Sequence, residues 1–166
     1  MKLFQSGLVI VAGFLGAAAA AGHADLDITK AHPKNDVRKT DVRVGLLRHF
    51  LKEKEAPAAR YAETFILEAD THGLDWRLLP SLAFVESGGG KHCRLNNLFG
   101  WDNGSSKFSS VTAAIHQVAQ SLAEGRSYRG KSTQAKLEAY NESPDYKSLV
   151  TGVMRRISPR VLPESL

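Results

Sequence analysis

The stretch that decides the fold is Leu78-Leu79-Pro80-Ser81-Leu82-Ala83-Phe84-Val85-Glu86-Ser87-Gly88-Gly89-Gly90. It is apolar, it ends in a carboxylate, and three glycines then end the helix because they permit backbone angles that other residues avoid. Glu86 follows Ala83, Leu82 and Leu79 by three, four and seven residues. On a helix with about 3.6 residues per turn these positions share one face. The pattern therefore predicts a glutamate on the buried face of a helix.

A carboxyl group against apolar neighbours loses hydration in its charged form, which raises its pKa. A glutamic acid in that state is suited to protonate a leaving group near neutral pH. The alternative is a surface glutamate at a helix end, paired with Lys91, His92 or Arg94. The helix alone leaves both interpretations open, because structural ion pairs are commoner than catalytic acids.

Length and composition indicate one soluble domain. The chain has 166 residues, of which 43% are hydrophobic and 23% charged, as is normal for a globular protein. The net charge of +5 and the pI near 9.4 favour an anionic partner. The basic residues are scattered and are not interleaved with aromatic residues, so the sequence does not predict nucleic-acid binding.

The N-terminal segment resembles a secretory signal peptide over residues 1–24. Lys2 gives a positive start, an apolar run follows, and Gly22-His23-Ala24 offers small residues for cleavage after Ala24, with cleavage after Ala21 as the alternative. The apolar run is shorter than the roughly 20 residues that span a bilayer, although an uncleaved anchor stays open. We expect a flexible leader over 25–40, a folded domain over 41–166, and a secreted, periplasmic or cell-wall-associated protein with no membrane span after cleavage.

Helical periodicity recurs through the rest of the chain, and the segment after the glycines is irregular. Residues 91–109 contain the turn signal Asp102-Asn103-Gly104, around which Leu98-Phe99 and Lys107-Phe108 are predicted to form a small hairpin. The sequence thus predicts a mainly α fold with five or six helices and one very short irregular or β lobe. The predicted helices cover about 41–55, 58–72, 75–87, 110–124, 132–139 and 144–157.

Local signals refine three of these helices. Asp75 is a candidate cap for the helix that carries Glu86, and Pro80 predicts a kink or a later start. Ser109 or Ser110 is expected to cap the helix that follows the irregular segment. The buried face of the last helix is predicted to consist of Tyr146, Leu149, Val150, Val153 and Ile157.

Three motifs in a fixed order carry a family resemblance. They are Glu86-Ser87-Gly88-Gly89-Gly90, then Asn96-Asn97-Leu98-Phe99-Gly100-Trp101, then a late block with Tyr140-Asn141. Together they resemble the glucosaminidase domains of bacterial cell-wall hydrolases and are similar to lytic transglycosylases, both of the lysozyme-like superfamily. The resemblance covers roughly residues 58–157, and the ordered series is more specific than any one motif.

The resemblance implies an α+β lysozyme-like fold and cleavage of β-1,4 bonds between N-acetylglucosamine and N-acetylmuramic acid in peptidoglycan. Glu86 matches the catalytic acid of the family. The motifs also point to substrate-binding roles, for which turn chemistry or core packing are the alternatives. The residues concerned are Ser87, Asn97, Trp101, Tyr140 and Asn141.

No cofactor or metal is expected, and we expect a monomer that acts on peptidoglycan or a related amino-sugar glycan. The histidines show no metal-ligand spacing with one another or with Cys93. Cys93 is the only cysteine, so the domain has no internal disulfide and depends on its core for stability.

The chain departs from the family in its short lobe. Many glucosaminidase domains carry a second carboxylate there, whereas Asp102 is the only acid between Gly100 and the next helix. Three explanations follow. In the first, Asp102 serves as the base. In the second, Glu86 acts alone and gives a 1,6-anhydro product. In the third, the domain binds glycan without cleaving it.

Overall fold

The computed structural model describes residues 41–159, and helices dominate this part of the chain. The signal peptide predicted over 1–24 and the leader predicted over 25–40 lie outside the described residues. In chain order, the helical segments are α1 (Val42–Glu53), the 3-10 helix η1 (Pro57–Tyr61), α2 (Ala62–Thr71), α3 (Leu78–Ser87), α4 (Val111–Glu124), α5 (Thr133–Tyr140) and α6 (Pro144–Ile157).

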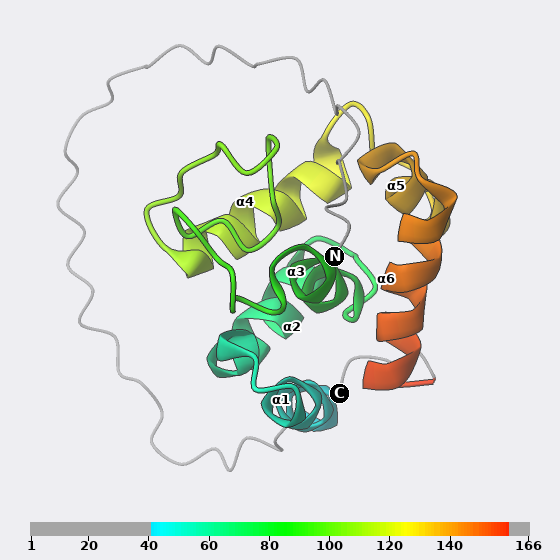
Figure 1. The fold of residues 1–166 in the computed structure, drawn as a ribbon. Coiled ribbons are helices and arrows are strands. Elements are labelled where there is room, and N and C mark those ends of the chain that lie inside the picture. The colour runs from blue at the N-terminus through cyan, green and yellow to red at the C-terminus, as the bar shows by residue number, and fades with distance from the viewer. Residues whose placement is uncertain (1–40, 160–166) are drawn as a thin grey trace, which may run out of the picture.

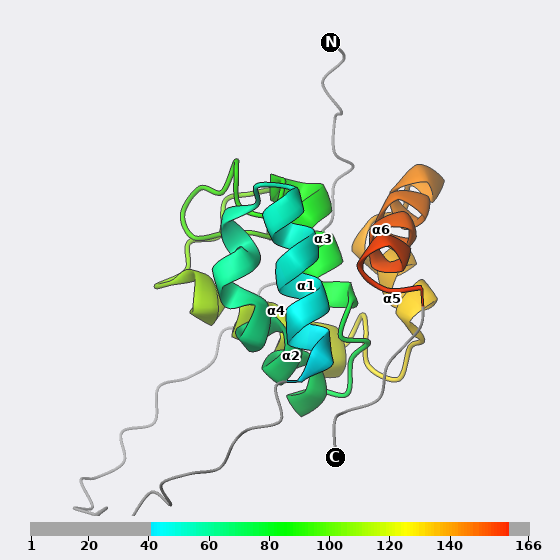
Figure 2. The same ribbon diagram turned by 90° about the horizontal axis from the view of Figure 1, so that it is seen from below.

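Helix α3 lies at the centre of the molecule. Figure 1 shows it nearly end-on, with α1 and α2 on one side and α6 on another, and Figure 2 shows α5 and α6 together along one flank. Helix α3 packs against α2 and α6, and α2 packs against α4. This central position explains why α3 is apolar over most of its surface: its first six residues, from Leu78 to Ala83, are all buried.

The predicted hairpin is wrong. Residues 91–109 form no strand, and their one isolated bridge joins Arg94 to Asn97. The backbone N–H of Phe108 donates to the carbonyl of Leu95 (3.0 Å), not to residues 98–99. The cause is local: Leu95 and Asn96 both take left-handed backbone angles, which turn the chain just before the residues predicted for the first strand. The lobe is therefore irregular.

The start of α3 also differs in detail. Asp75 does not occupy the cap position, which belongs to Arg77, although its Oδ1 accepts the backbone N–H of Arg77 at 3.0 Å. The helix begins at Leu78, later than Asp75 suggests, in agreement with the expectation from Pro80. Pro80 then lies in the first turn, where its missing N–H breaks no helical hydrogen bond.

The face of α6 is predicted correctly except at one position. Leu149 is 54% exposed, and Met154 is buried in addition to the other residues predicted for this face. The cap predicted for α4 is confirmed at Ser110, which accepts the backbone N–H of Ala113, and the structure also shows Ser132 as the cap of α5, where it accepts the N–H of Ala135. Among the described residues, no helix is long and apolar enough to cross a membrane.

Candidate active site

Glu86 lies in the last turn of α3, directly before the three glycines. Leu79, Leu82 and Ala83 are buried as predicted, but Glu86 itself is exposed, so the prediction of a buried residue is wrong. Gly88 and Gly89 take φ angles of 63° and 64° and turn the chain after Ser87, which is buried, whereas Glu86 faces solvent. The acid is therefore within reach of a ligand from solvent.

The carboxyl group of Glu86 is nevertheless set against protein atoms. The Tyr146 hydroxyl donates to Glu86 Oε1 at 2.6 Å. On its other side, a Cβ added to Gly100 would lie only 2.8 Å from Glu86 Oε2. Lost hydration raises the pKa of Glu86, and the hydrogen bond from Tyr146 partly opposes this because it favours the charged form. The environment thus favours the protonated acid while solvent still reaches the residue.

Tyr146 is the functional candidate that the sequence did not identify. It was predicted only as part of the buried face of α6, and it is buried. Burial, together with the nearby Glu86 charge, raises the pKa of its phenol far above the ordinary value, so the hydroxyl keeps its proton and acts as a donor. The available signal was that a buried tyrosine hydroxyl requires a hydrogen-bond partner, but nothing in the sequence indicated Glu86 as that partner.

Three aromatic rings form a continuous group next to Glu86. Tyr140 and Tyr146 are stacked, with ring centroids 5.8 Å apart and planes at 7°, and Trp101 lies 5.8 Å from Tyr140 at 60°. The Tyr140 hydroxyl donates to the carbonyl of Phe99 at 2.6 Å, which ties α5 to the irregular segment. We call Trp101, Tyr140 and Tyr146 the aromatic group. It comes from three segments, and only the first two residues were predicted as site residues.

Asn97 organises the irregular segment from within. Its Oδ1 accepts the backbone N–H of Trp101 at 2.9 Å, and its Nδ2 donates to the carbonyls of Trp101 (2.9 Å) and Ser106 (3.2 Å). Asn96 similarly donates to the carbonyl of Phe108 at 2.9 Å. These side-chain-to-backbone bonds order the irregular segment. Because Asn97 is buried, its polar atoms hold Trp101 in place and do not face solvent.

Ser87 and Asn141 also serve local structure. Ser87 is buried, its hydroxyl donates to the carbonyl of Ala83 at 2.9 Å, and it accepts the N–H of Gly90 at 3.1 Å. Asn141 ends α5, and its Oδ1 accepts the N–H of Ser143 at 3.0 Å, which shapes the turn into α6. Ser87 thereby fixes the backbone next to Glu86, and Asn141 fixes the backbone that leads to Tyr146.

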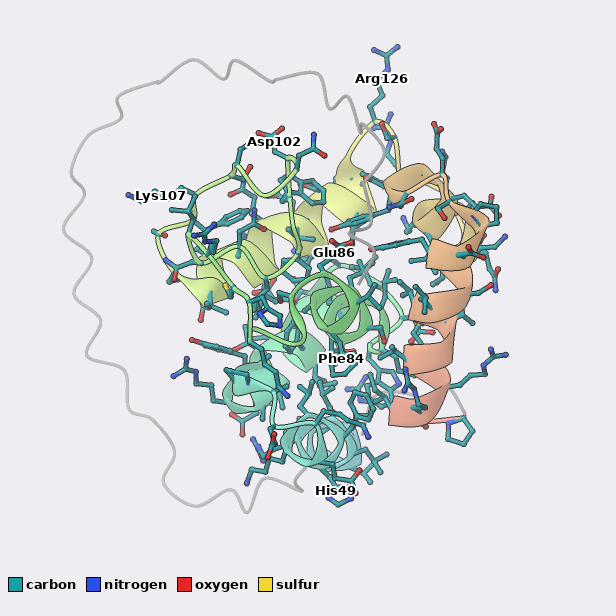
Figure 3. The ribbon with its side chains drawn as sticks, in the orientation of Figure 1. His49, Phe84, Glu86, Asp102, Lys107 and Arg126 are labelled. Carbon is teal, nitrogen blue, oxygen red and sulfur yellow. The ribbon has the colours of Figure 1, made fainter. Side chains whose placement is uncertain are left out.

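Asp102 lies at the outer part of the irregular segment, as Figure 3 shows, whereas Glu86 lies near the centre of the same view. Asp102 is exposed, has a left-handed φ of 55°, and its Oδ2 accepts the Ser105 hydroxyl at 2.7 Å. Burial and Tyr146 are the influences on the pKa of Glu86, and no carboxylate of the described residues is among them. The geometry of Asp102 is that of a turn residue.

Metal ligands were not predicted, yet the fold brings Glu68, His72 and His116 together, with one possible ligand atom from each within 4.8 Å of the others. Glu68 lies on α2, His72 directly follows α2, and His116 lies on α4. Cys93 is partly buried, and burial raises the pKa of its thiol, which disfavours the nucleophilic thiolate.

Comparisons with known proteins give no relative: no family profile, no curated protein and no solved structure matches this chain. The case for a function therefore depends on the motifs and on the geometry around Glu86.

Proposed function

We propose that this protein is an exported glycosidase that cleaves β-1,4 bonds between N-acetylglucosamine and N-acetylmuramic acid in peptidoglycan, with Glu86 as the general acid. The observation that carries the proposal is the setting of this one carboxyl group. It is reachable from solvent, its pKa is raised by lost hydration, and Tyr146 fixes one of its oxygens. The motif resemblance supports the substrate class and a lysozyme-like fold.

Cleavage of a glycosidic bond requires a proton on the bridging oxygen as the bond breaks. Tyr146 occupies Glu86 Oε1, so Oε2, which faces Gly100, is the oxygen available to carry the proton. Gly100 leaves room there because it has no side chain. Within the aromatic group, Trp101 and Tyr140 are partly exposed and are the candidates for stacking on the apolar faces of sugar rings, whereas Tyr146 is buried.

A second candidate is a lytic transglycosylase, which gives a 1,6-anhydro product. It is favoured by the observation that no carboxylate of the described residues contributes to the pKa of Glu86. A hydrolase that uses two carboxylates keeps them about 5–10 Å apart. With Glu86 as the acid and no carboxylate of the described residues acting on its pKa, the sugar's own hydroxyl serves as the nucleophile in this candidate mechanism. Asp102 as a base belongs to the hydrolytic alternative.

The test is digestion of purified sacculi by the wild type and by Glu86→Gln, with mass spectrometry of the released muropeptides. We expect the wild type to release them and Glu86→Gln to release essentially none at an unchanged circular dichroism spectrum. The mass of the product separates the two candidates, since a 1,6-anhydro end lacks one water relative to a hydrolysed end. Full activity of Glu86→Gln would exclude Glu86 as the acid.

A wall-binding module without activity is the remaining alternative. Cosedimentation of the wild-type protein with sacculi, without release of soluble muropeptides under any condition that supports the fold, would establish that alternative and reject both enzymatic candidates.

A further inference from the structure

Glu68, His72 and His116 form a compact cluster between α2 and α4. Glu68 is on α2, His72 lies one turn further along as the first residue after that helix, and His116 is on α4. Glu68 Oε2 lies 2.9 Å from His116 Nδ1 and 3.5 Å from His72 Nε2. The two imidazole rings are 5.7 Å apart and tilted by 55°. One carboxylate oxygen thus lies between two histidines.

The inner part of this cluster is buried. The side chains of Glu68 and His72 are only 13% and 9% exposed. His72 Nε2 is fully shielded and makes no hydrogen bond within residues 41–159, and it lies on the Glu68 side of the ring. A buried carboxylate requires a positive partner, and a buried imidazole nitrogen requires a ligand or a donor. Both requirements are met at once by a cation between them.

We propose that Glu68, His72 and His116 bind one Zn²⁺ ion that joins α2 to α4. Two imidazoles and a carboxylate are a donor set that suits zinc, with a water molecule as the fourth ligand on the exposed side. Zinc bonds of about 2.0–2.2 Å in a tetrahedron place ligand atoms roughly 3.4 Å apart. The possible ligand atoms of Glu68, His72 and His116 are 2.9 Å to at most 4.8 Å apart, a range that includes this value.

Loading the site requires only a small movement. The His116 side chain is 56% exposed, so its ring is free to rotate until Nδ1 and Glu68 Oε2 face the same ion. His72 is held by burial and needs no such change. The exposed position of His116 also gives the ion a route from solvent.

Glu124 supports the same site from outside. Its Oε1 lies 4.0 Å from His72 Nδ1, and its Oε2 accepts Gln120 Nε2 at 3.3 Å. The 4.0 Å separation is longer than a hydrogen bond, so Glu124 places its charge near the ring and does not fix the tautomer of His72. Glu124 is not a ligand of the proposed ion.

The experiment is isothermal titration calorimetry of the full chain, without a histidine tag, with ZnCl₂, and visible absorption of the Co²⁺-substituted protein. We expect one Zn²⁺ per chain and the intense visible bands of four-coordinate Co²⁺. An excess of Mg²⁺ or Ca²⁺ is not expected to compete, because these ions prefer oxygen ligands. Saturating zinc should raise Tm by roughly 5–10 °C at a hundredfold excess over Kd.

Matched variants make the assignment specific. His72→Asn and Glu68→Gln should lose the site, and Glu124→Gln should weaken zinc binding much less, because it removes only a largely exposed charge near the ring. His49→Asn is the control, because His49 and Glu53 are also four residues apart on a helix but are exposed. Cys93→Ser tests capture by the free thiol. Both controls should bind zinc like the wild type.

His116→Asn keeps the test decisive if a buried variant fails to fold. Its side chain is exposed, so the fold should persist while zinc binding and the Co²⁺ bands are lost. The proposal is overturned if the wild type binds no zinc, if His116→Asn binds it unchanged, or if Cys93→Ser abolishes binding. The neighbours described for the Glu86 carboxyl group, Tyr146 and Gly100, do not belong to this cluster, so failure of the zinc site leaves the proposed glycosidase activity unaffected.

Discussion

At the scale of single residues, the chemistry proposed for this protein depends on the two oxygens of Glu86. Oε1 is held by a hydroxyl 60 residues away in the sequence, and Oε2 faces a glycine. Gly100→Ala perturbs Oε2, with Gly104→Ala as its control. Tyr146→Phe perturbs Oε1, with Tyr140→Phe as its control.

Gly100→Ala is expected to displace the Glu86 carboxyl group. The new methyl group would lie 2.8 Å from Oε2, closer than atoms tolerate, and the flexible glutamate is the group that moves. Misplacing a reacting group by about 1 Å costs on the order of 100-fold in rate. Left-handed strain at φ 60° should also cost about 1–2 kcal/mol of stability. Sacculus digestion and thermal unfolding measure the two effects.

Gly104→Ala is the control for this substitution. Gly104 is also left-handed, with φ 81°, but a Cβ there meets no atom within 4 Å. It should show a similar loss of stability with activity retained. An equal loss of activity in both variants would show that strain in the segment, and not displacement of Glu86, is the cause.

Tyr146→Phe is expected to shift the pH dependence of activity. The Tyr146 hydroxyl favours the charged carboxylate and lowers the pKa of Glu86, so its removal raises that pKa further. A general acid works only when protonated, and activity falls as pH rises through its pKa. The basic limb of the kcat/KM profile should therefore move to higher pH in this variant.

Tyr140→Phe separates this effect from a general loosening of the aromatic group. Its hydroxyl bonds the carbonyl of Phe99 and not Glu86. We expect a loss of about 0.5–1.5 kcal/mol of stability, the usual worth of a hydrogen bond, with the basic limb unchanged. A shift of the same size in both variants would reject the assigned role of the Tyr146 hydroxyl.

At the scale of elements, the glycine turn after α3 decides where Glu86 can point. Gly89 approaches the turn between α1 and η1 so closely that an added Cβ would lie 2.7 Å from Ala56 Cβ. Its carbonyl also accepts the N–H of Ala58 at 2.9 Å. The turn is thus fastened to η1, and the end of α3 is fixed in direction.

Gly89→Ala should therefore destabilise the protein more than Gly88→Ala. Alanine in the left-handed conformation should cost about 1–2 kcal/mol of stability at either position. At Gly89 alone, the added methyl group also overpacks the contact with Ala56, which should cost about 1–3 kcal/mol more. The closest side-chain atom to a Cβ on Gly88 is Lys91 Cβ at 3.5 Å, an ordinary contact. Urea unfolding measures both, and equal midpoints would contradict the role given to the contact with Ala56.

At the scale of the whole molecule, Arg77 ties the start of α3 to the end of α6. Its Nη1 donates to the carbonyl of Ser158 at 2.9 Å across 81 residues, and its Nη2 pairs with Asp75 at 2.7 Å. The side chains of Arg77 and Asp75 are both largely buried. Because Glu86 and Tyr146 lie on these same two helices, this tie also fixes the relative position of the proposed acid and its donor.

Arg77→Ala should lower the free energy of unfolding by about 3–5 kcal/mol, because it leaves a buried carboxylate and a buried carbonyl without this partner. Arg48→Ala is the control: it breaks an exposed pair with Glu63 and should cost less than about 1 kcal/mol. Chemical denaturation of both variants measures the difference. A small effect at Arg77 would mean that apolar packing alone holds α3 against α6.

Local signals were sufficient for most of the helices. The helical periodicity of α4 and its cap at Ser110 depend on interactions within a few residues, so the sequence predicts them directly. The hairpin prediction failed because Leu95 and Asn96 take left-handed angles and the two asparagines bond distant carbonyls of the segment. Turn propensity identifies a turn but does not determine which backbone groups it joins.

The sequence by itself determined that a mainly helical domain carries Glu86 at the end of its central apolar helix, followed by a glycine turn and an irregular segment. Only the tertiary structure decided that Tyr146 bonds Glu86, that Gly100 faces its other oxygen, and that His116 meets Glu68. The physical reason is that periodicity and capping are interactions over a few residues. The direction of each of these side chains is set instead by how helices from distant parts of the chain pack together.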